Sequence, residues 1–453
     1  MNSFLLNRQL GTIGQQTLAK AQNNRLLHSL QAAPNIQFTL QTSSGTGNTQ
    51  EKVVAHGAGV SSIAIDRFEG RYMLSGGADS SLAIWDLEKD VFSGDGTLQY
   101  TPLGRVTKTS LAQSLGITHL SFFPFDSGAF ITSSYDRSVK IFSSETLVAS
   151  ATFDLGSIVY SHSTSPVASH LLVACASQHP AVRLIDLRTG SSTHSLPGHS
   201  GSVLTVAWHP KDENILASGA SDGRCRLWDV RRSASSLGVL DMEDSVGIGG
   251  YDGNGTGSRQ RDRGQAHSGT VNGVAWTDDG RYIVSTGHDE RMRVWDMTTG
   301  ANTLANFGPM LKNRYAALLL PLIAPSHLSP ANTEVLYFPN PGEILSFDMY
   351  SGRLLKRLRV PASPIHPGLH GSLRSLANRT TSLAWRAHCI EMYSAHADGT
   401  IRCWRPRTWE DVNPDYDELA PHDRADGHAT ERKRKHEELD QIFQDLTKRA
   451  PGK

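Results

Sequence analysis

One sequence pattern recurs along the chain: LASGASDGRCRLWD at residues 216–229, with the copies LSGGADSSLAIWD at 74–86 and IVSTGHDERMRVWD at 283–296. In each copy a Ser precedes an Asp by four residues, and a Trp follows the Asp by six. The segments ITSSYDRSVKIF (131–142) and YSAHADGTIRCW (393–404) keep the same spacing from Asp to the aromatic residue. Five copies with one internal spacing indicate a structural repeat.

The residues around each copy favour β-strands. Alternating apolar stretches such as VLTVAWHP (203–210) come first, followed by a polar turn and a short apolar strand. Short strands that end in a Trp-Asp pair are typical of a propeller blade. Two weaker copies, which end near Ile185 and Phe347, bring the number of units to seven. The sequence therefore predicts an all-β fold, a seven-bladed WD-repeat β-propeller over residues 53–410.

Two segments flank the predicted ring. Residues 1–35 predict a helix pair, one helix up to Leu10 and a second from about 15 to 31, because Gly11 and Pro34 stop helices. Residues 411–453 are charged and polar, and we expect this tail to be mostly disordered. Within the ring, the Gly-rich insert 233–264 is expected to be mobile. We expect Lys52–Ala55 to supply the outer strand of the last blade and so close the circle.

Composition limits the function classes. The 44 basic and 44 acidic residues balance, so no global field attracts nucleic acid, and we expect no direct sequence-specific nucleic-acid binding. No apolar run approaches the ~20 residues that cross a bilayer, and the first ten residues do not form a secretory signal, which predicts a soluble intracellular protein without a membrane partner. The four Cys residues show no metal-binding spacing, and we expect them to be small buried side chains, with no cofactor and no metal.

Ser, His and Asp recur together, which raises the question of a hydrolase. A nucleophilic triad needs a single such set in one cleft, whereas here the set occurs three times, each time with a Trp. Repetition favours buried structural tetrads, in which Asp accepts hydrogen bonds from His and backbone while Ser links His to Trp. We therefore expect no catalytic residues. The three predicted tetrads are His56, Ser75, Asp79 and Trp85; His199, Ser218, Asp222 and Trp228; and His267, Ser285, Asp289 and Trp295.

One Trp-Asp pair carries an additional signal. Trp228-Asp229-Val230-Arg231 places an Arg two residues beyond the pair, and Arg188 takes the corresponding place after Ile185-Asp186. An Arg at the rim of a blade can donate several hydrogen bonds to a partner protein. The alternative is that it pairs with a carboxylate of its own blade. The pattern resembles the box with which WD-repeat receptors dock on the adaptor of cullin-4 ubiquitin ligases.

The N-terminal segment is unusually rich in large apolar residues. Short helices are marginally stable alone and need a surface that buries their apolar face. That surface is either the chain's own propeller or a groove in a partner. We expect the second, with residues 4–30 disordered in the free protein and folded on the adaptor. The predicted adaptor contacts are Phe4, Leu5, Leu6, Leu10, Leu18, Leu26, Leu27, Arg188, Trp228, Asp229 and Arg231.

Several segments together resemble the Cockayne syndrome group A protein family over roughly residues 1–412. They include FLLNRQ (4–9), EGRYMLSGGAD (69–79), VYSHSTSPV (159–167) and AHSGTVNGV (266–274). The resemblance implies a non-enzymatic substrate receptor of a cullin-4 RING E3 ubiquitin ligase in transcription-coupled nucleotide excision DNA repair. The implied partners are the ligase adaptor, which is the large subunit of the damage-specific DNA-binding protein, and a Cockayne syndrome group B-type translocase at stalled RNA polymerase II. Blade seven departs from the family because it lacks a Gly-His start.

The charged tail contains a possible nuclear-import signal, Arg432-Lys433-Arg434-Lys435. A solvated charged tail has the same composition, but together with the resemblance this cluster predicts a nuclear protein. The alternative to a ligase receptor is a general WD-repeat scaffold or chromatin reader that attaches to no ligase.

Overall fold

A computed structural model describes residues 7, 9–11, 14–40, 54–92, 96–108, 113–167, 169–232, 236–243, 264–315, 317–330, 333–361 and 378–407. The chain divides into two compact units, residues 1–406 and 407–453. Everything described except Arg407 belongs to the first unit. The predicted charged tail with its import signal, Phe4 to Leu6, and most of the insert 233–264 lie outside the described residues.

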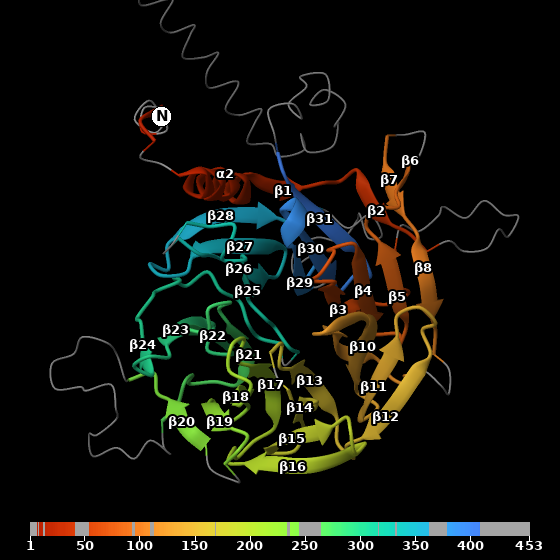
Figure 1. The fold of residues 1–453 in the computed structure, drawn as a ribbon, viewed down its shortest axis with the longest axis vertical. Coiled ribbons are helices and arrows are strands. Elements are labelled where there is room, and N and C mark those ends of the chain that lie inside the picture. The colour runs from red at the N-terminus through yellow and green to blue at the C-terminus, as the bar shows by residue number, and fades with distance from the viewer. Residues whose placement is uncertain are drawn as a thin grey trace, which may run out of the picture. The chain divides into compact units, whose positions relative to one another are not determined.

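Seven four-stranded antiparallel sheets form the ring that Figure 1 shows, which confirms an all-β, seven-bladed propeller. Blade 1 contains β3 (Val60–Ile65), β4 (Tyr72–Gly77), β5 (Leu82–Asp86) and β8 (Pro102–Val106). Blade 2 contains β9 (Ile117–Phe123), β10 (Asp126–Ser134), β11 (Ser138–Ser143) and β12 (Ala149–Asp154). Blade 3 contains β13 (Val159–Thr164), β14 (Leu172–Ser177), β15 (Ala181–Asp186) and β16 (Ser191–Pro197). Blade 4 contains β17 (Val203–Trp208), β18 (Ile215–Ala220), β19 (Cys225–Asp229) and β20 (Ser236–Leu240).

The remaining blades follow the same order from inner to outer strand. Blade 5 contains β21 (Val271–Trp276), β22 (Tyr282–Gly287), β23 (Arg291–Asp296) and β24 (Ala301–Asn302). Blade 6 contains β25 (Leu322–Ile323), β26 (Val335–Asn340), β27 (Glu343–Asp348) and β28 (Leu354–Arg359). Blade 7 contains β29 (Thr380–Arg386), β30 (Glu391–His396), β31 (Ile401–Pro406) and β1 (Leu30–Ala32). A further three-stranded sheet joins β2 (Ile36–Phe38), β6 (Val91–Phe92) and β7 (Leu98–Tyr100).

The repeat sequence explains how neighbouring blades pack. Small residues on the second strand of each blade leave space for the next blade. A Cβ at Gly219 would lie 2.6 Å from Val271 of blade 5 and 2.8 Å from Thr205, closer than side chains tolerate. Trp228 on the following strand is fully buried in the core shared with blade 3. The Ser-Gly-Ala run and the Trp of the repeat are therefore two halves of one packing arrangement.

Closure of the ring differs from the prediction. β1 pairs antiparallel with β31 through Leu30↔Pro406 and Ala32↔Trp404, so β1 is the outer strand of blade 7. The prediction that Lys52–Ala55 supplies this strand is wrong. Ala55 only donates its backbone N–H to the Gly399 carbonyl in the turn between β30 and β31, at 2.9 Å.

Among the described residues, α2 (Gln15–Ser29) is the one α-helix, and η2 (Ala387–Cys389) is a short 3₁₀ helix. The first helix of the predicted pair falls largely on undescribed residues, so the pair itself is not shown. α2 stops at Ser29 because the chain enters β1 at once, with Leu30 already extended at φ −51° and ψ 132°. Segment 1–35 thus includes a strand of the propeller.

Two further expectations concern the surroundings of the chain. No helix in the described part of the protein has the length and apolarity to cross a membrane. Three of the four cysteines, Cys175, Cys225 and Cys403, are buried as expected. Cys389 is exposed, so the expectation is wrong for this residue, which lies in the η2 turn rather than on an inward-facing strand position.

Candidate interaction surfaces

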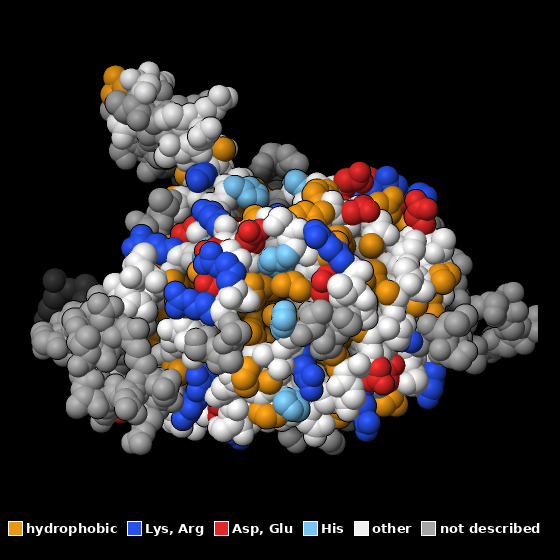
Figure 2. All heavy atoms as spheres, turned by 60° about the horizontal axis from the view of Figure 1, so that its bottom comes forward, with side chains coloured by type: hydrophobic (Ala, Val, Ile, Leu, Met, Phe, Trp, Pro, Cys, Tyr) orange, Lys and Arg blue, Asp and Glu red, His pale blue; other side chains and the backbone are white. Residues whose placement is uncertain are grey.

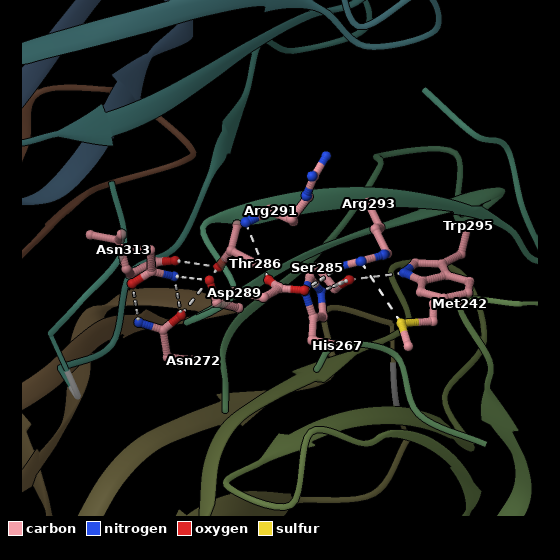
Figure 3. Close-up of polar contacts among 12 residues, drawn as sticks. Met242, His267, Asn272, Ser285, Thr286, Asp289, Arg291, Arg293, Trp295 and Asn313 are labelled. Carbon is pink, nitrogen blue, oxygen red and sulfur yellow. Dashed lines mark hydrogen bonds and ion pairs between the residues drawn. The ribbon is translucent and has the colours of Figure 1, made fainter. Parts of the chain in front are cut away.

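The tetrad of blade 5 is a continuous chain of hydrogen bonds (Figure 3). Trp295 Nε1 donates to Ser285 Oγ at 2.9 Å, and Ser285 Oγ lies 2.8 Å from His267 Nε2. His267 Nδ1 lies 2.8 Å from Asp289 Oδ1, and Arg293 donates to Asp289 Oδ2 at 2.8 Å. The chain joins the inner loop, β22, the turn and β23, so it fixes the shape of the whole blade.

Blades 4 and 1 contain the other two predicted tetrads. In blade 4, Trp228 Nε1 donates to Ser218 Oγ at 2.7 Å, Ser218 lies 2.8 Å from His199 Nε2, and His199 Nδ1 lies 3.1 Å from Asp222. In blade 1, Trp85 Nε1 and His56 Nε2 lie 2.8 and 2.7 Å from Ser75 Oγ. The last link differs there, because Ser81 stands between His56 and Asp79, while the direct His56–Asp79 distance is 3.8 Å.

Burial sets the protonation of these groups. Burial lowers the pKa of His267, which is therefore neutral at neutral pH. Burial alone would raise the pKa of Asp289, but hydrogen bonds from His267 and Arg293 outweigh it and hold this pKa well below its usual value. The same balance lowers the pKa of Asp222 to about 2, with His199 as the main donor. Each tetrad therefore contains an ionised Asp, as an Asp that accepts several donors requires.

The alignment Ser–His–Asp is that of a hydrolase, but its surroundings are not. Ser75, Ser218 and Ser285 are all 0 % exposed, and each Oγ already contacts an indole N–H. A nucleophile must reach a substrate carbonyl within a cleft. These three Ser side chains lie inside blades, where their hydrogen bonds stabilise the fold.

Two blades contain variants of the tetrad that the sequence analysis missed. In blade 7, Trp404 Nε1 donates to Ser394 Oγ, which lies 2.8 Å from His396 Nε2. This His follows the Ser by two residues on the same strand, so it replaces the missing Gly-His start. In blade 2, Gln113 takes the place of His and lies 2.9 Å from both Thr132 and Ser138. The spacing Ser-x-His in YSAHADG was the signal for the first variant.

The Asp of each Trp-Asp pair needs a cationic partner, and the source of that partner differs between blades. In blade 1, Arg71 donates to both oxygens of Asp86, at 3.1 and 2.8 Å. Blade 5 uses Arg281, 3.6 Å from Asp296. Both Arg residues precede the second strand of their blade, where blade 4 has an Asn.

In blade 4 the missing cation is replaced by Arg231. Its Nε and Nη2 donate to the two oxygens of Asp229 at 3.0 and 2.9 Å. The Arg231 side chain is nevertheless 68 % exposed, whereas Asp229 is buried. Arg231 therefore has a local partner and also presents part of its guanidinium at the rim. Arg188 is exposed and donates to the Ser169 carbonyl at 3.0 Å. Trp228 is fully buried, so the prediction that its side chain contacts an adaptor is wrong.

The N-terminal segment packs on its own propeller at its C-terminal end. Leu27 and Leu30 are buried against blades 6 and 7, in a cluster with Tyr337, Leu358 and Trp404. Lys356 Nζ holds the end of α2 by donating to the carbonyls of His28 and Leu30, at 3.1 and 2.7 Å. The prediction that Leu27 contacts an adaptor is therefore wrong, and residues 15–30 are ordered without a partner.

The other predicted apolar contacts are more accessible. Leu18 and Leu26 are half-buried, and Leu10 is 67 % exposed. Phe4, Leu5 and Leu6 lie outside the described residues. Because β1 runs antiparallel to β31, α2 comes to the face where the third strands end, the same face as Arg188 and Arg231. Figure 1 shows α2 beside blades 6 and 7 and the loops of blades 3 and 4 across the ring, so these two predicted contact regions are separate.

The opposite face contains a cavity of about 320 Å³ at the mouth of the central channel. It is lined by three tyrosines, Tyr135, Tyr160 and Tyr315, and by the cations Lys312 and Arg379. The guanidinium of Arg379 lies 4.3 Å from the centroid of the Tyr315 ring. The sequence analysis did not identify these residues, because they come from five separate loops that only ring closure brings together.

Fold and tetrads together define the class: this chain is a WD40-repeat β-propeller protein. The family described as "WD domain, G-beta repeat" matches residues 47–86, 104–143, 190–229 and 260–296. Among curated proteins, the chain is 28 % identical to WD repeat-containing protein ATCSA-1 of Arabidopsis thaliana, over 88 % of this chain and 94 % of that relative.

Two other relatives match shorter parts. Radiation-sensitive protein 28 of Saccharomyces cerevisiae is 26 % identical over 40 % of this chain and 38 % of its own length. Ribosome biogenesis protein ytm1 of Aspergillus niger is 28 % identical over 55 % of each chain. Only the similarity to ATCSA-1 extends over nearly the whole length of both proteins among these three.

Proposed function

We propose that this protein is the substrate receptor of a cullin-4 RING ubiquitin ligase in transcription-coupled nucleotide excision repair, with no catalytic activity of its own. The observation that carries the proposal is the similarity to ATCSA-1 along 88 % of the chain, which includes the segments that resemble the Cockayne syndrome group A family. A buried Ser in every predicted tetrad supports a binding role over hydrolysis.

The proposed adaptor surface is the face that carries the ends of the third strands. Leu10, Arg188 and Arg231 are exposed there or lead into it, and residues 1–13 precede a helix that is itself fixed to blades 6 and 7. α2 then acts as a rigid base from which the preceding segment reaches the adaptor. This corrects the expected disorder-to-order transition, which is now restricted to the residues before α2.

The opposite face is the proposed side for a Cockayne syndrome group B-type translocase and other factors at stalled RNA polymerase II. Tyrosines and cations at the channel mouth are residue types enriched in protein interfaces. We also propose a nuclear location, based on Arg432–Lys435.

A general WD-repeat scaffold is the second candidate, and one observation favours it. Arg231, the residue that resembles the adaptor box, is hydrogen-bonded to Asp229 of its own blade. Under this alternative Arg231 only replaces the cation that Arg71 provides in blade 1.

Purification of the full chain from nuclei at native abundance separates the two functions. A ligase receptor retains the cullin-4 adaptor and cullin-4 in stoichiometric amounts, whereas a scaffold is recovered without either. A variant with Leu10→Glu should lose both proteins and keep its propeller, because Leu10 is 67 % exposed. Adaptor recovery that is equal for the variant and the parent chain would remove this residue from the interface.

A further inference from the structure

The outer strand of blade 5 is too short to cover its neighbour. β24 contains only Ala301 and Asn302, which pair with Asp296 and Trp295 of β23. In blade 4 the outer strand continues past Trp228 and also covers Leu227 and Cys225. The corresponding positions of β23, counted from its Trp, are Val294 and Met292. The outer strands of blades 1, 2, 3 and 6 also reach this position, through the pairs Leu82↔Val106, Val139↔Phe153, Val182↔Leu196 and Ile344↔Leu358.

The chain leaves blade 5 early because its next residues serve another purpose. Thr303 N–H donates to the Val294 carbonyl at 2.9 Å, and Leu304 then adopts a left-handed conformation with φ 59°. Phe307 and Leu311 are buried in the core of blade 6. The segment that could have extended β24 therefore crosses between two blades instead.

This departure leaves a strand edge open. In an antiparallel ladder, alternate residues direct their N–H and C=O groups to opposite sides. Val294 faces outward, as its bond from Thr303 shows, so Met292 faces outward as well. Within the described part of the chain, no backbone group pairs with Met292 on that side. An open edge of this kind is a template for one more strand.

A groove lies along this edge, with a volume of about 350 Å³. Its walls are β23 and the crossing segment, and they carry cationic, amide and apolar side chains: Arg291, Arg293, Asn302, Asn306, Leu304 and Phe307. No carboxylate lines it among the described residues, although Arg293 is paired with Asp289 behind it. Arg291 is exposed, and its side chain extends away from the tetrad network (Figure 3).

The groove is held open rather than free to collapse. Asn313 and Asn272, both buried, exchange hydrogen bonds of 2.7 and 2.9 Å and fix the end of the crossing segment (Figure 3). Basic side chains gather on the left of Figure 2, the side on which blades 5 and 6 lie in Figure 1. The edge thus combines a rigid wall, unpaired backbone groups and positive charge.

We propose that the outer edge of β23 at Met292–Val294 binds an extended acidic segment of a partner protein, which completes blade 5 as the missing part of β24. Backbone hydrogen bonds to Met292 and Val294 supply the pairing. Arg291 selects acidic side chains, and exposed Leu304 contacts an apolar side chain beside them. This site does not depend on attachment to a ligase.

Hydrogen exchange on the full chain tests the open edge. The amides of Met292 and Val294 should exchange at least tenfold faster than those of Cys225 and Leu227, their counterparts in the complete blade 4. Equal protection of the two pairs in the free chain would overturn the proposal. If protection of Met292 disappears only when residues 245–262 are deleted, the chain's own insert occupies the edge, and the proposal of a partner segment fails.

A synthetic peptide, acetyl-Asp-Val-Glu-Ile-Asp-Val-amide, tests the occupant. It should slow exchange at Met292 and Val294, and replacing its acidic residues by Lys should abolish this protection. Arg291→Glu should weaken binding at least tenfold. Arg224→Glu, the same position in blade 4, should leave binding unchanged, because β20 already covers that edge. Absence of protection with the acidic peptide, or equal affinity for both variants, would refute the proposed site.

Discussion

Replacement of Ser285 by Ala tests whether the tetrads stabilise the propeller. The substitution removes the Oγ that accepts the Trp295 indole N–H at 2.9 Å and that contacts His267 Nε2 at 2.8 Å. Both partners are 0 % exposed, so neither can bind water instead. An orphaned buried polar group costs about 1–3 kcal/mol, and two such groups give a loss of about 2–5 kcal/mol in the free energy of unfolding.

Urea denaturation followed by Trp fluorescence measures this loss. Thr299→Ala, an exposed substitution in the same blade, serves as the control and should change stability by less than about 0.5 kcal/mol. The denaturant slope should be unchanged, because the same surface unfolds. If Ser285→Ala is no more destabilising than the control, the tetrad does not have the structural role assigned to it. A purified hydrolytic activity that the substitution abolishes in a fully folded protein would refute the binding role as well.

Three other substitutions give separate tests. Burial lowers the pKa of His119 from 6.5 to about 4, so below pH 6.5 the unfolded chain binds a proton that the folded chain does not. Stability should fall from pH 6.5 towards 4 by up to about 1.4 kcal/mol per pH unit for this group, and unfolding curves of His119→Phe should show a correspondingly smaller slope. Arg231→Ala should weaken adaptor binding about tenfold by calorimetry, whereas Arg71→Ala, which breaks the same pair in blade 1, should not; equal effects would make Arg231 purely structural. Leu27→Ala should cost about 2–4 kcal/mol of stability because Leu27 is buried, and a stability equal to that of the parent chain would show that α2 is not anchored.

The fold was predictable because its signal is local and repeated. The spacing Ser–Asp–Trp fixes one turn and two strands of a blade, and seven copies define the ring. Closure was missed because β1 is only three residues long and has no repeat motif beside it. Its partner, β31, lies more than 370 positions later in the sequence, and only the pairing Leu30↔Pro406 reveals the relationship.

The interaction surfaces were predictable only in part. The exposure of Arg231 follows from its place after the strand, but its bond to Asp229 depends on an Asn that replaces Arg in the preceding turn. Leu27 looked like a docking residue because an apolar face does not reveal which surface buries it. The channel mouth and the short β24 required the closed ring, since the residues concerned are neighbours only in space.

The most direct test of the proposed function is calorimetric titration of the purified full chain with the purified cullin-4 adaptor. The measurement compares the parent chain with a variant that lacks residues 1–13 and retains α2 and β1. The account predicts one-to-one binding by the parent chain and at least a hundredfold loss of affinity in the variant, with unfolding curves that coincide. Absence of binding by the folded parent chain would contradict the ligase-receptor function and leave the scaffold in its place. Equal affinity of the two proteins would show that the segment before α2 is not the docking element.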